Sequence, residues 1–147
     1  MPDSLERLED GVFFNCFSLA EINGIENLER IWDGAFDNRR IKGSIKLNKH
    51  LKCLGEYAFA NTYIESVDFN HCGLEVIEDS AFQNCVRLRE VRGLDSRLRL
   101  IRTSAFSGCS ELESIEGADG EIEIEIYTFE DCDRLRTANL KIIQKSR

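Results

Sequence analysis

A phenylalanine preceded by Ala, Val or Thr recurs six times along this chain, at Phe13, Phe36, Phe59, Phe82, Phe106 and Phe129. Successive members of this series are separated by 23, 23, 23, 24 and 23 residues. Such constancy is typical of stacked repeats, because stacking places equivalent residues of every repeat in one continuous core. The spacing therefore predicts a solenoid rather than a conventional globular fold.

The repeats fill almost all of the 147 residues, so we expect one domain over residues 1–147. The predicted solenoid has about six repeats of about 23 residues. Their approximate boundaries are 5–27, 28–50, 51–73, 74–97, 98–120 and 121–142, with a basic C-terminal tail at 141–147.

Each repeat follows the pattern L-x-x-I-x-x-x-A-F-x-x-C-x-x-L-x-x-I, most clearly over residues 74–91 and 98–115. These apolar spacings fit neither one long helix nor simple alternation, so they predict a coil that turns repeatedly with its apolar side inward. A short strand is expected before each Ala-Phe pair, and a helical or 3-10 turn at the pair itself. A half-buried strand is expected after each turn, over 19–25, 41–47, 64–69, 88–94, 112–118 and 135–140.

Two details of the repeats predict local departures from regularity. Gly24, Gly93 and Gly117 follow the last core residue of their strands, where we expect them to allow a corner with unusual backbone angles. Ile41 and Ile64 come one residue earlier than the leucine of the other repeats, which predicts bulges in the second and third repeats.

Four of the six cysteines stand three residues after a repeat phenylalanine: Cys16, Cys85, Cys109 and Cys132. Because they mark a repeat position, a ladder of reduced, buried thiols is favoured over disulfide bonds. Reduced thiols, and a first segment without the pattern of a signal peptide, predict the cytoplasm or another reducing intracellular compartment. If a leader has been removed from this sequence, the cell surface is expected instead.

The charge of the chain limits its partners. It has 19 basic and 27 acidic side chains, giving a net charge of −8. This charge disfavours binding to nucleic acid or to an anionic membrane surface. No apolar run approaches the roughly 18 residues of a membrane-spanning helix. We therefore expect a protein partner, with no nucleic acid and no membrane span.

The repeated A-F-x-x-C-x-x-L-x-x-I core resembles the BspA-like, or Treponema pallidum-type, leucine-rich repeats. The resemblance covers about residues 5–142, although the only proline is Pro2, whereas members usually carry proline after the strand. It implies a right-handed parallel solenoid, mainly β, without catalytic machinery. Relatives of this kind are mostly recognition or adhesion proteins, usually exported and longer than this chain.

The sequence offers no enzymatic motif and no evidence for a cofactor. It has only two histidines, and it lacks the nucleophile, metalloprotease and phosphate-binding patterns. One weak metal candidate combines His50 and Cys53 with His71 and Cys72 one coil later, which are residue types that bind zinc. These four residues lack a fixed ligand spacing, so incidental surface and core roles are the favoured interpretation.

The face of the longer strands is the first candidate binding surface, because outward residues of successive strands stack into columns. A solvated face without a partner is the alternative interpretation. The expected outward residues are Glu21 and Asn23, Ser44 and Lys46, Ser66 and Asp68, Glu90 and Arg92, Ser114 and Glu116, then Thr137 and Asn139.

Aromatic and arginine residues form the second candidate surface, because interface energy concentrates on Trp, Tyr and Arg. The residues are Phe17, Trp32, Arg40, Tyr57 and Tyr63. The alternative is that Phe17 and Trp32 shield the first coil from water.

The leading hypothesis is thus a non-enzymatic protein-binding scaffold. A structural subunit of a larger assembly, with end-to-end self-association through open strand edges, is the second. A surface adhesin is the third.

Overall fold

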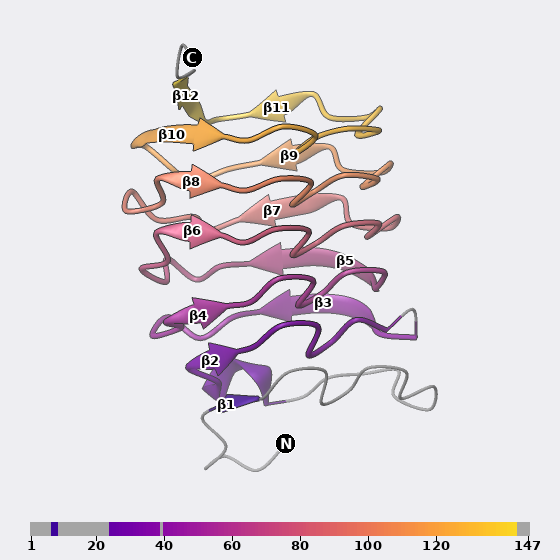
Figure 1. Ribbon diagram of the computed structural model, residues 1–147, viewed down its shortest axis with the longest axis vertical. Coiled ribbons are helices and arrows are strands. Elements are labelled where there is room, and N and C mark those ends of the chain that lie inside the picture. The colour runs from indigo at the N-terminus through magenta and orange to yellow at the C-terminus, as the bar shows by residue number, and fades with distance from the viewer. Residues whose placement is uncertain (1–6, 9–23, 39, 144–147) are drawn as a thin grey trace.

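Short apolar segments at a fixed spacing form parallel strands that stack into a right-handed β-solenoid of about five turns (Figure 1). The computed structural model describes residues 7–8, 24–38 and 40–143. The repeat architecture expected from the phenylalanine spacing is thereby confirmed. Helix is almost absent from the described residues, which contain one 3-10 helix, η1, at Ile25–Asn27.

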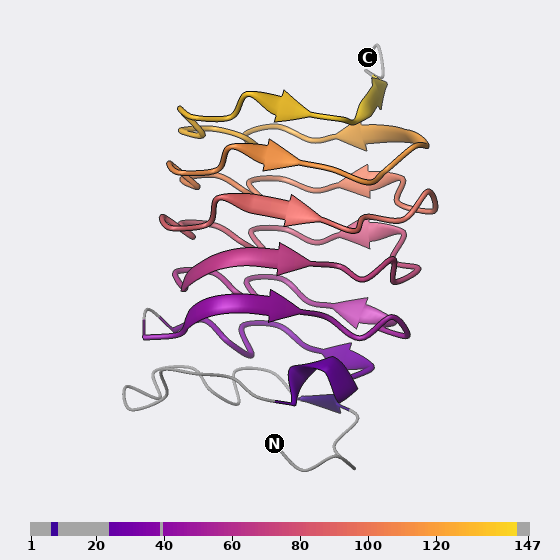
Figure 2. The ribbon, with the colours of Figure 1, turned by 180° about the vertical axis from the view of Figure 1, so that it is seen from behind.

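From β2 to β11, each coil contributes one strand to each of two opposite faces, and every strand pair among the described residues is parallel (Figures 1 and 2). The strands that follow the Ala-Phe turns form one sheet in the order β11-β9-β7-β5-β3. It is here called the long-strand sheet because it contains the two longest strands of the described residues, β3 and β5. Its members are β3 (Lys42–Lys46), β5 (Tyr63–Asp68), β7 (Glu90–Arg92), β9 (Ser114–Ile115) and β11 (Thr137–Ala138).

The opposite face carries the strands that precede the Ala-Phe turns, and here the stack is divided into two sheets. The order is β1-β2-β4 in one sheet and β12-β10-β8-β6 in the other, so β4 and β6 are not paired. The strands are β1 (Arg7–Leu8), β2 (Arg30–Ile31), β4 (Cys53–Leu54), β6 (Val76–Ile77), β8 (Leu100–Ile101), β10 (Glu121–Ile124) and β12 (Lys141–Ile143).

The repeat phenylalanines form one file through the core. Ring centroids of consecutive members from Phe36 to Phe129 lie 5.1, 5.5, 5.3 and 5.8 Å apart, and the rings are nearly parallel. Phe69 packs edge-on against Phe82 at 5.9 Å. Leu, Ile and Val of both strand layers surround this file and are buried. Phe13 lies outside the described residues.

The Ala-Phe segments are not helical, contrary to the expectation of a helical or 3-10 turn. Backbone N–H groups alternate between two acceptors: Ala58 donates within its own coil to Gly55, whereas Phe59 donates to Ala81 of the next coil at 2.8 Å. Residues with left-handed backbone angles, such as Tyr57 and Asn61 at φ 55° and 60°, interrupt any helix. The inter-coil bonds therefore replace the continuous i→i−3 pattern of a 3-10 helix.

The cysteine ladder is present and reduced in the part of the chain that the structure describes. Cys85, Cys109 and Cys132 are free thiols. Each donates a hydrogen bond of 3.1 Å to the carbonyl oxygen of a phenylalanine one coil earlier. Burial raises the pKa of the Cys132 thiol to about 11. These thiols thus link coils as neutral donors, while Cys16 lies outside the described residues.

The glycine corners and one of the two predicted bulges are also confirmed. Gly24, Gly93 and Gly117 have φ of 83°, 72° and 114°, in the left-handed region. The register between β3 and β5 shifts between Gly43 and Ser44, which marks a bulge in the third repeat.

Candidate protein-binding surfaces

The long-strand sheet presents two columns of outward side chains, as the sequence predicted. Its pairing register aligns Ser66 with Glu90 and Asp68 with Arg92, while Val67 and its partner Val91 point into the core. The first column contains Ser44, Ser66, Glu90, Ser114 and Thr137. The second contains Lys46, Asp68 and Arg92, and Glu116 continues it through its bond to Val91.

Charges on this face are mixed and exposed. The Arg92 guanidinium lies 3.6 Å from the carboxylate of Asp68 and 3.9 Å from that of Glu90. Exposed pairs of this kind contribute little to folding. The columns therefore give the surface a charge pattern that can vary from coil to coil without disturbing the core beneath it.

Tyr63 and Arg40 lie at the start of this sheet. The Tyr63 N–H donates to the carbonyl of Ile41 at 2.7 Å, which places it next to the segment that follows Arg40. The Arg87 guanidinium lies 4.8 Å from the centre of the Tyr63 ring, a cation–π distance. Tyr63 is partly exposed and Arg40 is exposed, so an aromatic group flanked by arginines edges the sheet.

The predicted aromatic patch is divided by the Ala-Phe turn. Trp32 follows β2 and is half-buried, and Tyr57 lies in the turn itself with 45% of its surface exposed. Arg40 and Tyr63 come after the turn. Trp32 also aligns with Gly55 rather than with Tyr57, because Ile31 pairs with Leu54. Phe17 and Glu21 lie outside the described residues.

The four metal candidates do not form a site in the described part of the chain. His50 and His71 are exposed, Cys53 is half-buried, and Cys72 is buried. No group of three His, Cys, Asp or Glu residues within the described ranges could hold a metal ion. Burial raises the pKa of the Cys72 thiol, which disfavours the thiolate that binds zinc.

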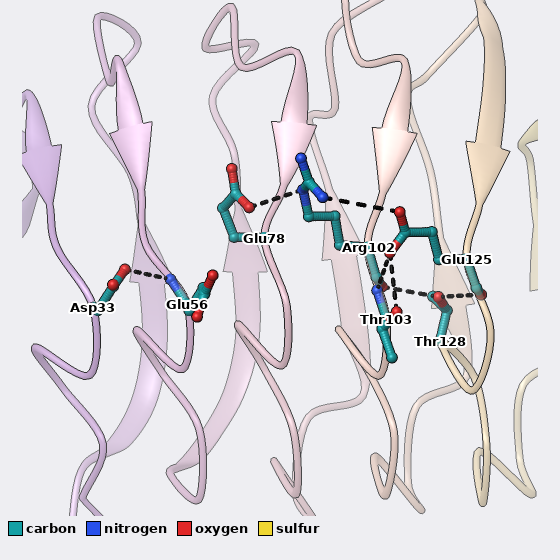
Figure 3. A network of polar contacts seen from close by, with 7 residues as sticks. All are labelled: Asp33, Glu56, Glu78, Arg102, Thr103, Glu125 and Thr128. Atoms are coloured by element: carbon teal, nitrogen blue, oxygen red, sulfur yellow. Dashed lines mark hydrogen bonds and ion pairs between the residues drawn. The ribbon is translucent and has the colours of Figure 1, made fainter.

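A polar network on the opposite face was missed by the sequence analysis (Figure 3). Arg102 lies between two carboxylates, 3.0 Å from Glu78 and 3.9 Å from Glu125. Glu125 also accepts hydrogen bonds from the backbone and side chain of Thr103, both at 2.9 Å. The signal was available, because Glu78, Arg102 and Glu125 each directly follow the isoleucine that ends their strand.

Comparison with known proteins decides the family. A model of the BspA type leucine rich repeat region matches residues 1–96 and 77–146, with six copies. The chain belongs to this family. No curated protein matches it.

Among solved structures, this BspA-type chain is similar to three bacterial leucine-rich repeat proteins. A leucine-rich repeat protein from Bacteroides ovatus is 28% identical, with a TM-score of 0.81 over 95% of this chain and 36% of its own. A leucine rich cell surface protein from Faecalibacterium prausnitzii is 21% identical, with a TM-score of 0.64 over 99% and 34%. The Treponema pallidum leucine rich repeat protein is 21% identical, with a TM-score of 0.58 over 92% and 52%.

The BspA-type chain thus spans between about a third and a half of the length of these proteins. Membership of the family suggests a protein-interaction or adhesin-like module. Leucine-rich repeat proteins are typically scaffolds without enzymatic activity. None of the helices in the described ranges is long and apolar enough to cross a bilayer.

Proposed function

We propose that this chain is a non-enzymatic module that binds a partner protein through the long-strand sheet and the edge formed by Arg40 and Tyr63. The observation that carries the proposal is the pair of outward columns, whose side chains are at least partly exposed and chemically varied above fully buried Val67 and Val91. A sheet fixed by its core can hold such side chains in place before a partner arrives, which lowers the entropy cost of binding.

The test compares two charge swaps that leave the net charge unchanged. Asp68→Arg with Arg92→Asp inverts one ion pair of the second column, while Glu121→Lys with Lys141→Glu inverts an exposed pair on β10 and β12, whose atoms lie 3.2 Å apart. Affinity capture from native lysate with mass spectrometry should lose the partner only for the first swap. If both swaps retain it equally, the long-strand sheet is not the binding surface.

A second test concerns the aromatic residues. Tyr63→Ala should weaken capture because it removes a partly exposed ring next to Arg87. Trp32→Ala is the comparison, since Trp32 lies before the turn and packs at the N-terminal side of the described coils. An equal loss with both variants, without loss of circular dichroism, would favour one continuous patch across the turn.

An assembly subunit is the second candidate, favoured by apolar residues on the last coils. Ile126 is 58% exposed and Ile142 is 49% exposed. Light scattering after size exclusion tests this candidate, because end-to-end association would raise the mass with protein concentration. Ile142→Lys should then restore the monomer.

For localisation we propose a reducing intracellular compartment, which the free thiols of the described residues support. The competing proposal is the cell surface, supported by the description of the Faecalibacterium protein. Fractionation of cells that produce the full-length gene product distinguishes the two.

A further inference from the structure

Within the described residues, the stack of strands opposite the long-strand sheet is interrupted between β4 and β6. At neighbouring junctions the ladder is regular: Gly55 donates to Ile31 at 2.8 Å, and Arg102 donates to Ile77 at 2.9 Å. The corresponding bonds between β4 and β6 are missing from the described ladder, and the two strands belong to different sheets. Figure 1 shows these two strands farther apart than their neighbours, although the coils rejoin where Tyr57 donates to Asp79.

The pairing pattern identifies the backbone groups that face this gap. Glu75 and Ile77 accept bonds from the β8 segment, so they face away from β4. In a parallel strand, successive residues direct their backbone groups to opposite sides. The N–H and C=O of Val76 therefore face the gap. On the other wall, Cys53 and Gly55 face β2, which leaves the groups of Leu54 directed at Val76.

The gap is a groove of about 570 Å³. That volume lies within the range of ligand-binding pockets, about 300 to 1,000 Å³. Its floor is apolar, because Leu51 and Leu74 line it. Only 3% and 7% of their surfaces are exposed. The walls include Lys49, His50, Lys52, Glu75, Val76 and Glu78. The groove is thus lined like a peptide-binding cleft, with strand edges on both sides.

The corner that precedes β6 is one residue longer than the corner that precedes β4. Core residues Ile45 and Leu54 are nine positions apart, whereas the equivalent Val67 and Ile77 are ten apart. The longer corner contains Asn70 and His71, both with left-handed backbone angles at φ 53° and 52°. The opening thus coincides with a change of corner while the long-strand sheet stays continuous. The extra residue alone does not separate strands, because β8 and β10 pair although their corners differ by one residue as well.

Charges differ at the two ends of the groove. Lys49 and His50 are exposed at the end where β4 and β6 begin. At the far end, Glu78 lies 3.0 Å from Arg102 and close enough to Glu56 and Asp79 to interact with both electrostatically, so acidic groups outnumber the one arginine there. A strand running parallel to β4 would place its N-terminal residues beside Lys49 and its C-terminal residues beside Glu78.

We propose that the groove between β4 and β6 binds an extended peptide segment of a partner protein as an added parallel strand, acidic at its N-terminal end and basic at its C-terminal end. The main chain of the segment would bond to Leu54 on one side and Val76 on the other, joining the two sheets into one. Strand addition of this kind derives its affinity from main-chain hydrogen bonds. The groove lies on the face opposite the long-strand sheet, so this proposal is independent of the function proposed above.

The test uses fluorescein-labelled synthetic peptides and fluorescence polarisation with the full chain. One peptide has the sequence Glu-Glu-Thr-Val-Thr-Lys-Lys, and its matched control has the reversed order, Lys-Lys-Thr-Val-Thr-Glu-Glu. The first should bind more tightly than the second. Val76→Pro removes a groove-facing donor without touching the bonds to β8, and it should weaken binding about tenfold, as expected for one lost backbone hydrogen bond.

Val76→Thr, which keeps the donor and the branched side chain, should bind like the unmodified protein. If Val76→Pro fails to fold, the same question is answered by methylating the central amide nitrogens of the peptide, which leaves the protein unchanged. Binding that survives both changes would overturn the proposal, as would no binding of either peptide at millimolar concentration. The Asp68→Arg, Arg92→Asp swap should bind the peptide normally, which separates this site from the long-strand sheet.

Discussion

The central phenylalanine of the core file allows a quantitative test of the solenoid. Phe82 is completely buried and contacts three aromatic rings: Phe59, Phe106 and Phe69. Phe129 occupies the same repeat position at the end of the file, is only partly buried, and has one such neighbour among the described residues. The two positions have the same residue type in equivalent turns. A difference in the stability lost on substitution therefore measures the contribution of stacking between coils.

Replacing a buried phenylalanine by alanine costs about 3 to 5 kcal/mol, and each aromatic pair contributes about 0.5 to 1.5 kcal/mol of that stability. We therefore expect Phe82→Ala to cost about 4 to 5 kcal/mol and Phe129→Ala about 1 to 2 kcal/mol. With a urea dependence of about 2 kcal/mol per molar, the midpoint should fall by about 2 M for Phe82→Ala and by less than about 1 M for Phe129→Ala.

Circular dichroism in urea measures both midpoints, and the fluorescence of the single tryptophan, Trp32, reports the N-terminal coils separately. Because each coil contacts only its neighbours, Phe82→Ala should also separate the two transitions. The Trp32 fluorescence should then change at a higher urea concentration than the circular dichroism. Phe82→Leu is the control if the alanine variant does not fold, since it keeps most of the apolar volume and should cost about 1 to 2 kcal/mol. Equal losses for Phe82→Ala and Phe129→Ala would refute a stacked core.

Three further perturbations test individual contacts. The Cys132 thiol has a pKa of about 11 instead of its usual 9.0, so its contribution to stability is complete below about pH 9 and is lost as the pH rises through 11. Urea titrations from pH 8 to 11 should show a smaller alkaline loss for Cys132→Ala, and an unchanged loss would contradict the assignment. Gly93→Ala should lower stability by about 2 kcal/mol in thermal melts, because its Cβ would lie 2.5 Å from the Asp68 carboxylate at φ 72°; unaltered melting would show that the corner can relax. Tyr57→Gly should raise stability by about 0.5 kcal/mol by removing left-handed strain, whereas Val86→Gly, at an exposed position without such strain, should lower it.

The sequence was sufficient to predict the features that repeat in every coil. The phenylalanine spacing predicted the core file, and the outward columns followed because a strand exposes alternate residues, as Ser66 and Asp68 do around Val67. The left-handed corners were predictable because Gly93 and Gly117 occupy one repeat position. A structural feature that every coil has leaves the same residue pattern in every repeat of the sequence.

The features that depend on a difference between coils were harder to predict. Trp32 was grouped with Tyr57 as an aromatic residue of one candidate surface, but the pairing register places Trp32 beside Gly55. The opening between β4 and β6 coincides with one extra residue between Val67 and Ile77. The constant phenylalanine spacing conceals this residue, because the segment from Phe59 to Val67 is one residue shorter than the segment from Phe36 to Ile45. The binding residues themselves stay predictions, since sequence reveals which side chains are exposed but not what they contact.

The hydrogen bonds between successive Ala-Phe turns all run in one direction. Phe36 donates to Ala58, Phe59 to Ala81, Phe82 to Ala105 and Phe106 to Thr128, so every amide of this column is oriented toward the C-terminal coil. Aligned peptide groups add their dipoles, as they do along a helix. One edge of the solenoid therefore has a positive pole at its last described coil, where the acidic residues Glu130, Asp131 and Asp133 are clustered. A further coil, or an anionic group of another molecule, would meet a favourable electric field there, which gives the stack a polarity as well as an axis.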